Sequence, residues 1–553
     1  MKYLPRTSRL RSVAMRSVLN FRRSGGVGVL ATLAMFAMAK DVFSAPTQEG
    51  SRASAEQHRR QGMAYLERHQ FAQALDEFRS AVHLDPESAV SHDGVGLALA
   101  ASGHPEEAVP EFERAIQLSE DLTSTHLHLA MAYDLMGRTA DAIAQYEATL
   151  VLEPAFADAR YALSAACWKL GDGEGAIELL RQVVGENPSF AAEAHYNLGL
   201  ELRQQGNLEE AVRELKEAVE LQPQSPQSLV ALGQALTEKQ DLTEATEALR
   251  RAVELAPNRA EYHYDLGEAL RLKTDFEGAK MEFRSALRLE PRYPHTHRQL
   301  GLVLRQQGDY PAALSEFNEA VTADPGDADA QYYLGSALLK LNDLQGAIDH
   351  LSHAVNIDPY DSAKRVSLAG ALTRAGESRE AREQAKRAEE LNTLEANAGR
   401  SRVLLGSAMD YLKDGKVDAA LEELRQAAAL SPEYPDVQFQ LGRALQKKRA
   451  AADEVTSAFR KAIELKPNFA EAHLQLGLVL TQTGRTAAGL GEIKRAAELA
   501  PSLVEAHRML GEAAVKSEDW SGARAEFGAI LAWNSEDQEA RRELSLARSH
   551  HRQ

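Results

Sequence analysis

The sequence of 553 residues contains a single cysteine, Cys167, and only three tryptophans. One thiol excludes an intrachain disulfide and a cysteine-rich zinc site, and we interpret Cys167 as a small buried hydrophobe. The chain also lacks the GxxxxGK[ST] phosphate loop, the GxSxG nucleophile elbow and the HExxH metal motif. We therefore expect a protein that is not an enzyme, with no catalytic residue, no cofactor and no metal.

A surplus of positive charge is absent as well. Lys and Arg total 63 and Asp and Glu total 81, for a formal net charge of -18. The first fifty residues hold eight basic and two acidic residues, which leaves 55 basic against 79 acidic residues in the remainder. Because binding to nucleic-acid backbones requires a net basic face, we expect no nucleic-acid partner.

Repetition dominates everything after residue 50. Prolines recur at intervals of 34 residues or close to multiples of 34: Pro86, Pro154, Pro188, Pro223, Pro257, Pro291, Pro325, Pro359, Pro432, Pro467 and Pro501. When this proline is counted as position 32 of a unit, glycine recurs at position 8, as in Gly62, Gly96, Gly199, Gly267 and Gly477. Alanine recurs at position 20, as in Ala74, Ala142, Ala279 and Ala420, and phenylalanine at position 24, as in Phe78, Phe112, Phe283 and Phe527. A fixed period of this length indicates a stacked array.

Each unit predicts two amphipathic helices, because its apolar residues recur at spacings of three and four. The small residues at positions 8 and 20 allow helix A and helix B to cross closely, and the phenylalanine fills the space between neighbouring pairs. Glycines such as Gly137, Gly206, Gly308 and Gly484 are suited to a left-handed cap at the end of helix A. The proline lies just past helix B and stops it.

These columns resemble the tetratricopeptide repeat, or TPR. The resemblance implies an all-α, right-handed superhelical solenoid of stacked antiparallel helix pairs, and it covers about fourteen units. We divide the chain into a basic segment (1–50), ten repeats (55–395), an insertion or break (396–400), four repeats (401–535) and a capping helix with a tail (536–553). Glu120, Thr393 and Ser535 replace the closing proline. The inserted "TLEANAGRSR" favours a break or kink between the tenth and eleventh repeats.

The first fifty residues differ in kind from the array. A basic stretch precedes the apolar run "GGVGVLATLAMFAMA" at 25–39, which is shorter than the roughly 20 residues of a spanning helix but suits the core of a signal peptide. Ala37-Met38-Ala39 offers a cleavage site, and Met15 is an alternative start. We favour a cleaved signal over an uncleaved membrane anchor at 25–39, with a cytoplasmic protein that has a disordered tail as the third interpretation. The expected location is periplasmic or envelope-associated.

Histidine recurs at position 4 of the repeats, in His58, His92, His126, His195, His263, His297, His473 and His507. Equivalent positions in adjacent repeats lie on the order of 10 Å apart, whereas zinc needs nitrogens at about 2 Å. We therefore interpret this column as packing residues with a polar tip rather than as metal ligands.

In this family helix A lines the concave groove, and positions 2, 5, 6, 9, 12 and 13 face the ligand. Basic and aromatic residues recur there. Arginine offers bidentate contacts to carboxylates, and tyrosine offers a large flat face at modest entropic cost. The candidate groove residues are Tyr161, Trp168, Lys169, Tyr196, Arg203, Gln204, Tyr264, Arg271, Arg298, Arg305, Gln306, Tyr332, Tyr333, Lys340, Arg374, Phe439 and Lys447. A solvated face with repeat-packing residues is the alternative for any one of them.

The array is also similar to the TPR arrays of O-linked N-acetylglucosamine transferases, although only Asn197 matches their asparagine ladder at position 6. Exported bacterial TPR scaffolds are similar in architecture. These resemblances imply a non-catalytic scaffold that binds protein partners or extended peptides carrying acidic groups. The alternative is an envelope accessory that handles polysaccharide, or assembles its export machinery, with carbohydrate in the groove.

Overall fold

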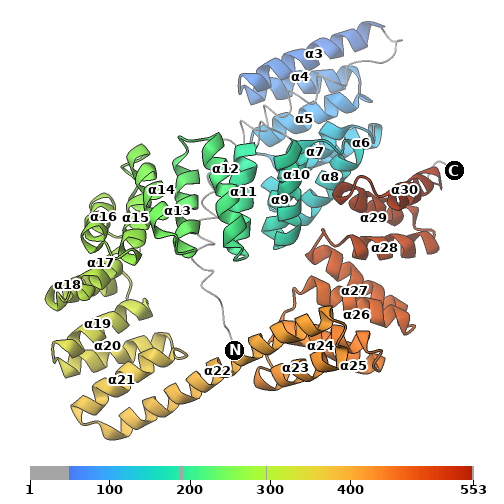
Figure 1. Cartoon of the computed structure of the whole chain (residues 1–553). Helices are drawn as coiled ribbons and strands as arrows, with labels where there is room; N and C mark the ends of the chain where they lie inside the picture. The colour runs from blue at the N-terminus through green and yellow to red at the C-terminus, as the bar shows by residue number, and fades with distance from the viewer. Residues whose placement is uncertain (1–48, 187–190, 294, 551–553) are drawn as a thin grey trace. The chain divides into compact units, whose positions relative to one another are not determined.

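The computed structural model describes residues 49–186, 191–293 and 295–550, which form helices α3 to α30 (Figure 1). These residues contain no strand, and consecutive helices pack as pairs, so the predicted all-α fold is confirmed. The predicted signal or anchor at 25–39 and the closing Pro188 lie outside the described residues. Within the described ranges, no helix has both the length and the apolar character needed to cross a bilayer.

The chain forms two compact units, residues 1–190 with 449–553 (unit 1) and residues 191–448 (unit 2). Unit 1 contains α3 (Glu49–Glu67), α4 (Phe71–Leu84), α5 (Ala89–Ala101), α6 (Pro105–Leu118), α7 (Thr123–Leu135), α8 (Thr139–Leu152), α9 (Ala157–Leu170), α10 (Gly173–Glu186), α25 (Ala452–Leu465), α26 (Ala470–Gln482), α27 (Thr486–Leu499), α28 (Val504–Lys516), α29 (Trp520–Trp533) and α30 (Gln538–His550).

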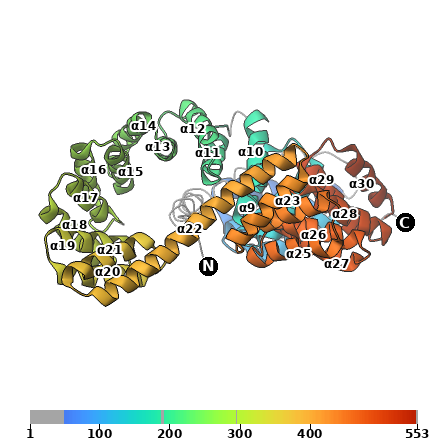
Figure 2. The same cartoon turned by 60° about the horizontal axis from the view of Figure 1, so that its bottom comes forward.

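Unit 2 contains α11 (Ala191–Gln204), α12 (Leu208–Leu221), α13 (Pro226–Glu238), α14 (Leu242–Leu255), α15 (Ala260–Leu272), α16 (Phe276–Leu289), α17 (Thr296–Gln306), α18 (Tyr310–Ala323), α19 (Ala328–Lys340), α20 (Leu344–Ile357), α21 (Ser362–Ala375), α22 (Ser378–Lys413), α23 (Val417–Leu430) and α24 (Pro435–Lys447). Within this unit, α11, α13 and α15 follow the inside of the curved stack and α12, α14 and α16 its outside (Figure 2).

The repeated small residues hold the helix pairs together. A Cβ added to Gly267 of α15 would lie 2.7 Å from Cε1 of Phe283 of α16, and Phe283 is fully buried. Real Cβ atoms are not found that close to a ring, so only glycine permits this crossing. The left-handed caps are confirmed, because Gly137, Gly206, Gly308 and Gly484 all have positive φ.

The predicted break at 396–400 is wrong. A single helix, α22, runs from Ser378 to Lys413 and serves as helix B of the tenth repeat and helix A of the eleventh. The physical reason is that Thr393 stands where other repeats have proline, and its hydroxyl bonds within the helix to the Glu389 carbonyl at 2.9 Å. The inserted residues contain no proline. With no stop signal, the helix continues, and the units divide at 190 and 448 rather than at 396–400.

Candidate functional site on the helix A face

All the predicted groove residues lie on helix A of their repeats, a set of side chains that we call the helix A face. Arg203, Tyr264, Arg298 and Phe439 are buried. Tyr161, Trp168, Tyr196, Arg271, Arg305, Tyr332 and Tyr333 are half-buried, and Lys169, Gln204, Gln306, Lys340, Arg374 and Lys447 are exposed or half-exposed. The exposures alone therefore separate residues that serve packing from residues that a ligand can reach.

The buried Arg203 forms a hydrogen bond and an ion pair with other residues of unit 2. Its Nη1 donates to Oε1 of Gln234 on α13 at 2.7 Å, and its Nε lies 3.7 Å from Oε1 of Glu238. Gln234 in turn donates to Oδ2 of Asp265 on α15 at 2.8 Å. Burial raises the pKa of Asp265 to about 8, although the hydrogen bond from Gln234 opposes the shift. This chain of contacts ties three successive repeats together.

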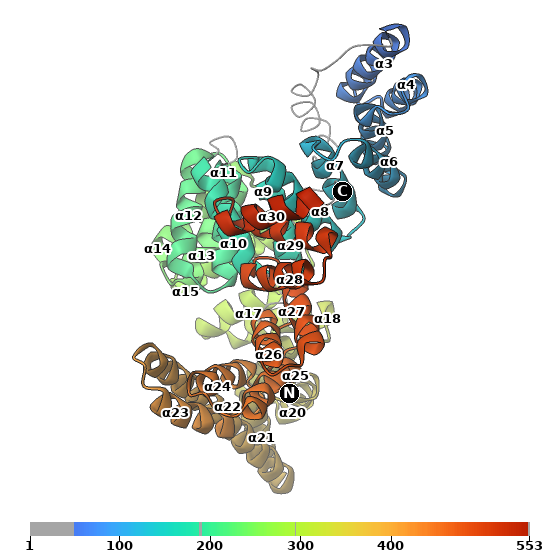
Figure 3. The same cartoon turned by 90° about the vertical axis from the view of Figure 1, so that its right-hand side faces the viewer.

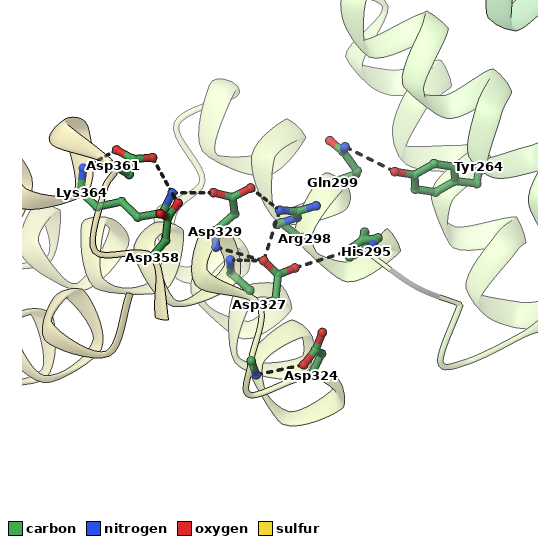
Figure 4. Close-up of polar contacts among 12 residues, drawn as sticks. Tyr264, His295, Arg298, Gln299, Asp324, Asp327, Asp329, Asp358, Asp361 and Lys364 are labelled. Carbon is green, nitrogen blue, oxygen red and sulfur yellow. Dashed lines mark hydrogen bonds and ion pairs between the residues drawn. The ribbon is translucent and has the colours of Figure 1, made fainter. Parts of the chain in front are cut away.

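Arg298 of α17 likewise forms ion pairs with residues at the start of α19 (Figure 4). Its Nη1 lies 2.8 Å from Oδ2 of Asp329 and 3.3 Å from Oδ1 of Asp327. Asp327 also accepts from the backbone N–H groups of Asp329 and Ala330, at 3.0 Å each, and so caps α19. Burial would raise the pKa of Asp327, but the hydrogen bond from His295 and the charge of Arg298 lower it to about 2.

The network continues across α19 to Lys364 of α21. Its Nζ lies 3.1 Å from Oδ1 of Asp329 and 2.6 Å from Oδ2 of Asp361. Burial would lower the pKa of Lys364, but these carboxylates raise it. The carboxylates around Arg298 and Lys364 are therefore structural and hold α17, α19 and α21 in register (Figure 4).

Three cations in the last turn of helix A form an ion pair or a hydrogen bond with helix A of the preceding repeat. Lys169 Nζ lies 2.7 Å from Asp134 Oδ1, and Arg374 donates to the Leu339 carbonyl at 2.9 Å. Lys447 donates to the Leu412 carbonyl at 3.4 Å. Each contact spans 35 residues, because residues one repeat and one position apart meet on adjacent helices A. These three cations bridge neighbouring repeats.

Arg271, Arg305 and Lys340 differ from all of these. They lie in the last turns of α15, α17 and α19, where the helix dipole favours positive charge. None of the three forms an ion pair within 4.0 Å in the described part of the chain, whereas Arg203 and Arg298 do. Arg305 lies 4.9 Å above the centre of the Tyr333 ring. We call these three residues the open cation row.

The aromatic residues of the face largely contact one another. The rings of Tyr332 and Tyr333 meet edge to face with centroids 5.1 Å apart, and Tyr333 stacks on Phe317. Tyr264 lies 5.5 Å from Tyr293, and its hydroxyl accepts from Gln299 at 3.5 Å. Trp168 and Tyr196 pack against buried clusters. These tyrosines therefore pack mainly against neighbouring aromatic and apolar side chains of the array.

The histidine column has a structural use that the sequence analysis missed. Nδ1 of His297 lies 2.8 Å from Oε2 of Glu316, and Nε2 lies 3.3 Å from the Pro291 carbonyl. His92, His263, His473 and His507 repeat both contacts with their own glutamate and proline. The glutamate stands 19 residues after the histidine, and that spacing was readable in the sequence. Among the described residues, no group of three potential ligands could hold a metal ion.

Stacked helix pairs, each with one helix A and one helix B, define a helical-repeat scaffold. The tetratricopeptide repeat model matches residues 59–122 and overlapping segments from 127 to 362, and a TPR repeat model matches 410–448. The chain belongs to the tetratricopeptide repeat family, whose fold is a protein-interaction scaffold. No curated protein matches the chain.

Solved structures with similarity include a MamA from Desulfovibrio magneticus RS-1, which is 26% identical over 30% of this chain and 94% of that one, with a TM-score of 0.29. TTC0263 from Thermus thermophilus is 25% identical over 33% and 100%, with a TM-score of 0.29. YrrB, described as a TPR protein with an unusual peptide-binding site, is 24% identical over 32% and 92%, with a TM-score of 0.28.

Proposed function

We propose that the protein is a non-catalytic scaffold that binds an extended, acidic segment of a protein partner along the open cation row. The observation that carries this proposal is the division of the cations on the helix A face. Arg203 and Arg298 form ion pairs with carboxylates inside the array, whereas Arg271, Arg305 and Lys340 have no acidic partner among the described residues, and Arg305 lies over the Tyr333 ring. Carboxylates of a ligand would pair with these three cations through charge-assisted hydrogen bonds.

The repeat geometry suggests how acidic groups on the ligand should be spaced. Helices at equivalent positions of adjacent repeats are on the order of 10 Å apart, and an extended chain in the polyproline II conformation has three residues per turn and advances about 3.1 Å per residue. A segment with a carboxylate at every third residue therefore matches successive members of the row. Tyr333, over which Arg305 lies, and Tyr332 in contact with it add apolar contact beside this charge.

The test uses a labelled peptide of about twelve residues with glutamate at every third position, together with a peptide of the same composition whose glutamates are contiguous. We expect the spaced peptide to bind the full chain at least tenfold more tightly than the contiguous one, and its binding to weaken with salt. Replacing Arg271, Arg305 and Lys340 together by alanine should remove the difference between the two peptides.

The matched control replaces Arg387, Lys461 and Arg495 by alanine. It removes the same charge but takes cations that pair within their own helices at i,i+3. If this control weakens the spaced peptide as much as the first variant does, the effect is overall charge, and the row is not the site. Tighter binding of an oligosaccharide than of either peptide, lost in the first variant, would instead favour the carbohydrate-handling alternative.

We also propose that the array works outside the cytoplasm. Support comes from the basic start and the apolar run at 25–39, which suit an export signal. A reporter that is active only after export, fused behind Gly50, tests this. Normal expression with an inactive reporter would remove both the signal and the envelope location.

A further inference from the structure

Unit 1 contains a contact between repeats that are far apart in the sequence. Helix α29 lies against α8 (Figure 3), and the Trp533 indole donates from Nε1 to Oε1 of Glu147 at 3.1 Å. Trp533 belongs to the same buried cluster as Tyr146 and Leu150 of α8. A Cβ at Gly528 would lie 3.7 Å from Cγ2 of Val151, an ordinary van der Waals distance, so α29 passes close to α8 at this point. The third repeat is thereby joined to the fourteenth.

A second polar contact lies beside the first. Oδ2 of Asp172 accepts from the Ser502 backbone N–H, and Oδ1 accepts from the Ser502 hydroxyl, both at 3.0 Å. Oδ1 also accepts from the Gly175 N–H at 2.9 Å and so caps α10. Asp172 therefore caps α10 of its own repeat whether or not it also binds Ser502. Glu147, in contrast, accepts its hydrogen bond from Trp533 on the other side of the contact.

Glu147 is the critical group because it is a carboxylate that is only 8% exposed. Burial raises its pKa, while the charge of His507 and the hydrogen bond from Trp533 act in the opposite direction and the charge of Glu526 raises it further. The Cys167 thiol nearby stays neutral, since burial and the charges of Asp172 and Glu147 raise its pKa well above its ordinary value. The positive charge that lowers the Glu147 pKa is that of His507.

His507 of α28 can supply that charge at mildly acidic pH. Nδ1 lies 2.7 Å from Oε2 of Glu526, and Nε2 lies 3.2 Å from the Pro501 carbonyl. Both partners accept hydrogen bonds, so a ring protonated on both nitrogens satisfies both. Burial alone would lower the pKa of His507, but the hydrogen bond to Glu526 and the charges of Glu147 and Glu526 raise it.

We propose that the contact of α8 with α28 and α29 is a proton-controlled latch, closed while His507 carries two ring protons and released when His507 is neutral and Glu147 is charged. A buried carboxylate without a cationic partner is strongly disfavoured. Once His507 is neutral, Glu147 keeps only the Trp533 N–H and faces the negative Glu526, and opening of the contact rehydrates it.

The direction of the pH dependence follows from proton binding. Glu147 and His507 both hold a proton more tightly when the contact is closed, so acid favours the closed form. The stabilisation from His507 is complete below its ordinary value of about 6.5 and is lost as pH rises through the raised value. The latch should therefore loosen on the alkaline side of neutrality.

The test measures the distance between spin labels in the full chain. Ala144→Cys on α8 and Ala525→Cys on α29 are exposed labelling positions, with the buried Cys167 replaced by alanine. We expect one short distance near about pH 6 and at least a tenfold rise in the ratio of open to closed molecules near about pH 8.5. Glu147→Gln keeps an acceptor for Trp533 but removes the charge, so it should stay closed at both values.

Trp533→Ala should open the contact at both pH values. Its control is Trp520→Ala on the same helix, whose ring stacks on His550 of α30 at 4.3 Å rather than on α8. An unchanged distance in the parent across this pH range overturns the proposal. So does a Glu147→Gln variant that opens on the alkaline side as the parent does, and that variant remains informative if Trp533→Ala fails to fold.

Discussion

Replacing Arg298 by alanine should destabilise the protein, whereas replacing Arg271 by alanine should leave its stability nearly unchanged, although both are arginines of helix A. The Arg298 side chain is only 8% exposed and pairs with two aspartates. The Asp329 side chain is 51% exposed. Its ion pair with Arg298 therefore contributes about 0.2 to 1 kcal/mol to the stability of the fold, as a surface pair does. The Asp327 side chain is only 10% exposed, and loss of one charged hydrogen bond there costs about 1.5 to 3 kcal/mol. Together these contributions lead us to expect Arg298→Ala to destabilise α17 and α19 by about 2 to 4 kcal/mol.

The assay is amide hydrogen exchange read by peptide, because repeat arrays open locally rather than all at once. A loss of about 2 kcal/mol corresponds to roughly thirtyfold faster exchange in peptides from α17 and α19. Arg271 has no acidic partner to lose among the described residues, so Arg271→Ala should leave α15 and its neighbours within about 0.5 kcal/mol of the parent. Equal protection in the two variants would refute the division into structural and open cations.

Two further predictions follow from the repeat contacts. Gly267→Ala places a Cβ 2.7 Å from the Phe283 ring and should lower the free energy of unfolding by about 1 to 3 kcal/mol. The Cβ of Gly370→Ala on α21 meets nothing within 4 Å, so this variant should be more stable than the parent by about 0.5 to 1 kcal/mol. Equal shifts of the melting temperature in the two variants would contradict this. The hydrogen bond to Glu316 raises the pKa of His297 despite burial, so its contribution to stability is complete below about 6.5 and is lost as pH rises through the raised value. Glu316→Gln should lower that pKa in an NMR titration of the ring, and a curve that does not move would show that the carboxylate is not the cause.

The recurring positions of the repeat could be predicted from the sequence because the residues that make each contact recur in many repeats. Gly267 against Phe283 is one copy of a pattern, a glycine packed on a large apolar residue 16 positions later, that recurs in most repeats, and its spacing alone implies the crossing. The open cations could be located but not told apart from the structural ones. Whether an arginine is free depends on what stands 29 to 31 residues away on the adjacent helix, as Asp327 and Asp329 do for Arg298, and Arg271 has no such neighbour in the described part of the chain.

Two features lay beyond the sequence for different reasons. The sequence shows Thr393 at the position where other repeats have proline. The consequence depends on whether the following residues can continue a helix, and they do so through α22. The contact of Glu147 with Trp533 joins residues 386 positions apart. It occurs once and follows no periodicity, so no pattern could indicate it.

The central claim is that ligands bind on the helix A face at the open cation row. A photoreactive amino acid at Gln306, which is exposed beside Arg305 on α17, tests it directly with the spaced glutamate peptide. The comparison position is Met281 of α16, which is 66% exposed on a helix outside the curve (Figure 2). The account predicts crosslinking from position 306, its loss when Arg271, Arg305 and Lys340 are replaced by alanine, and none from position 281. Crosslinking from position 281 alone would contradict it.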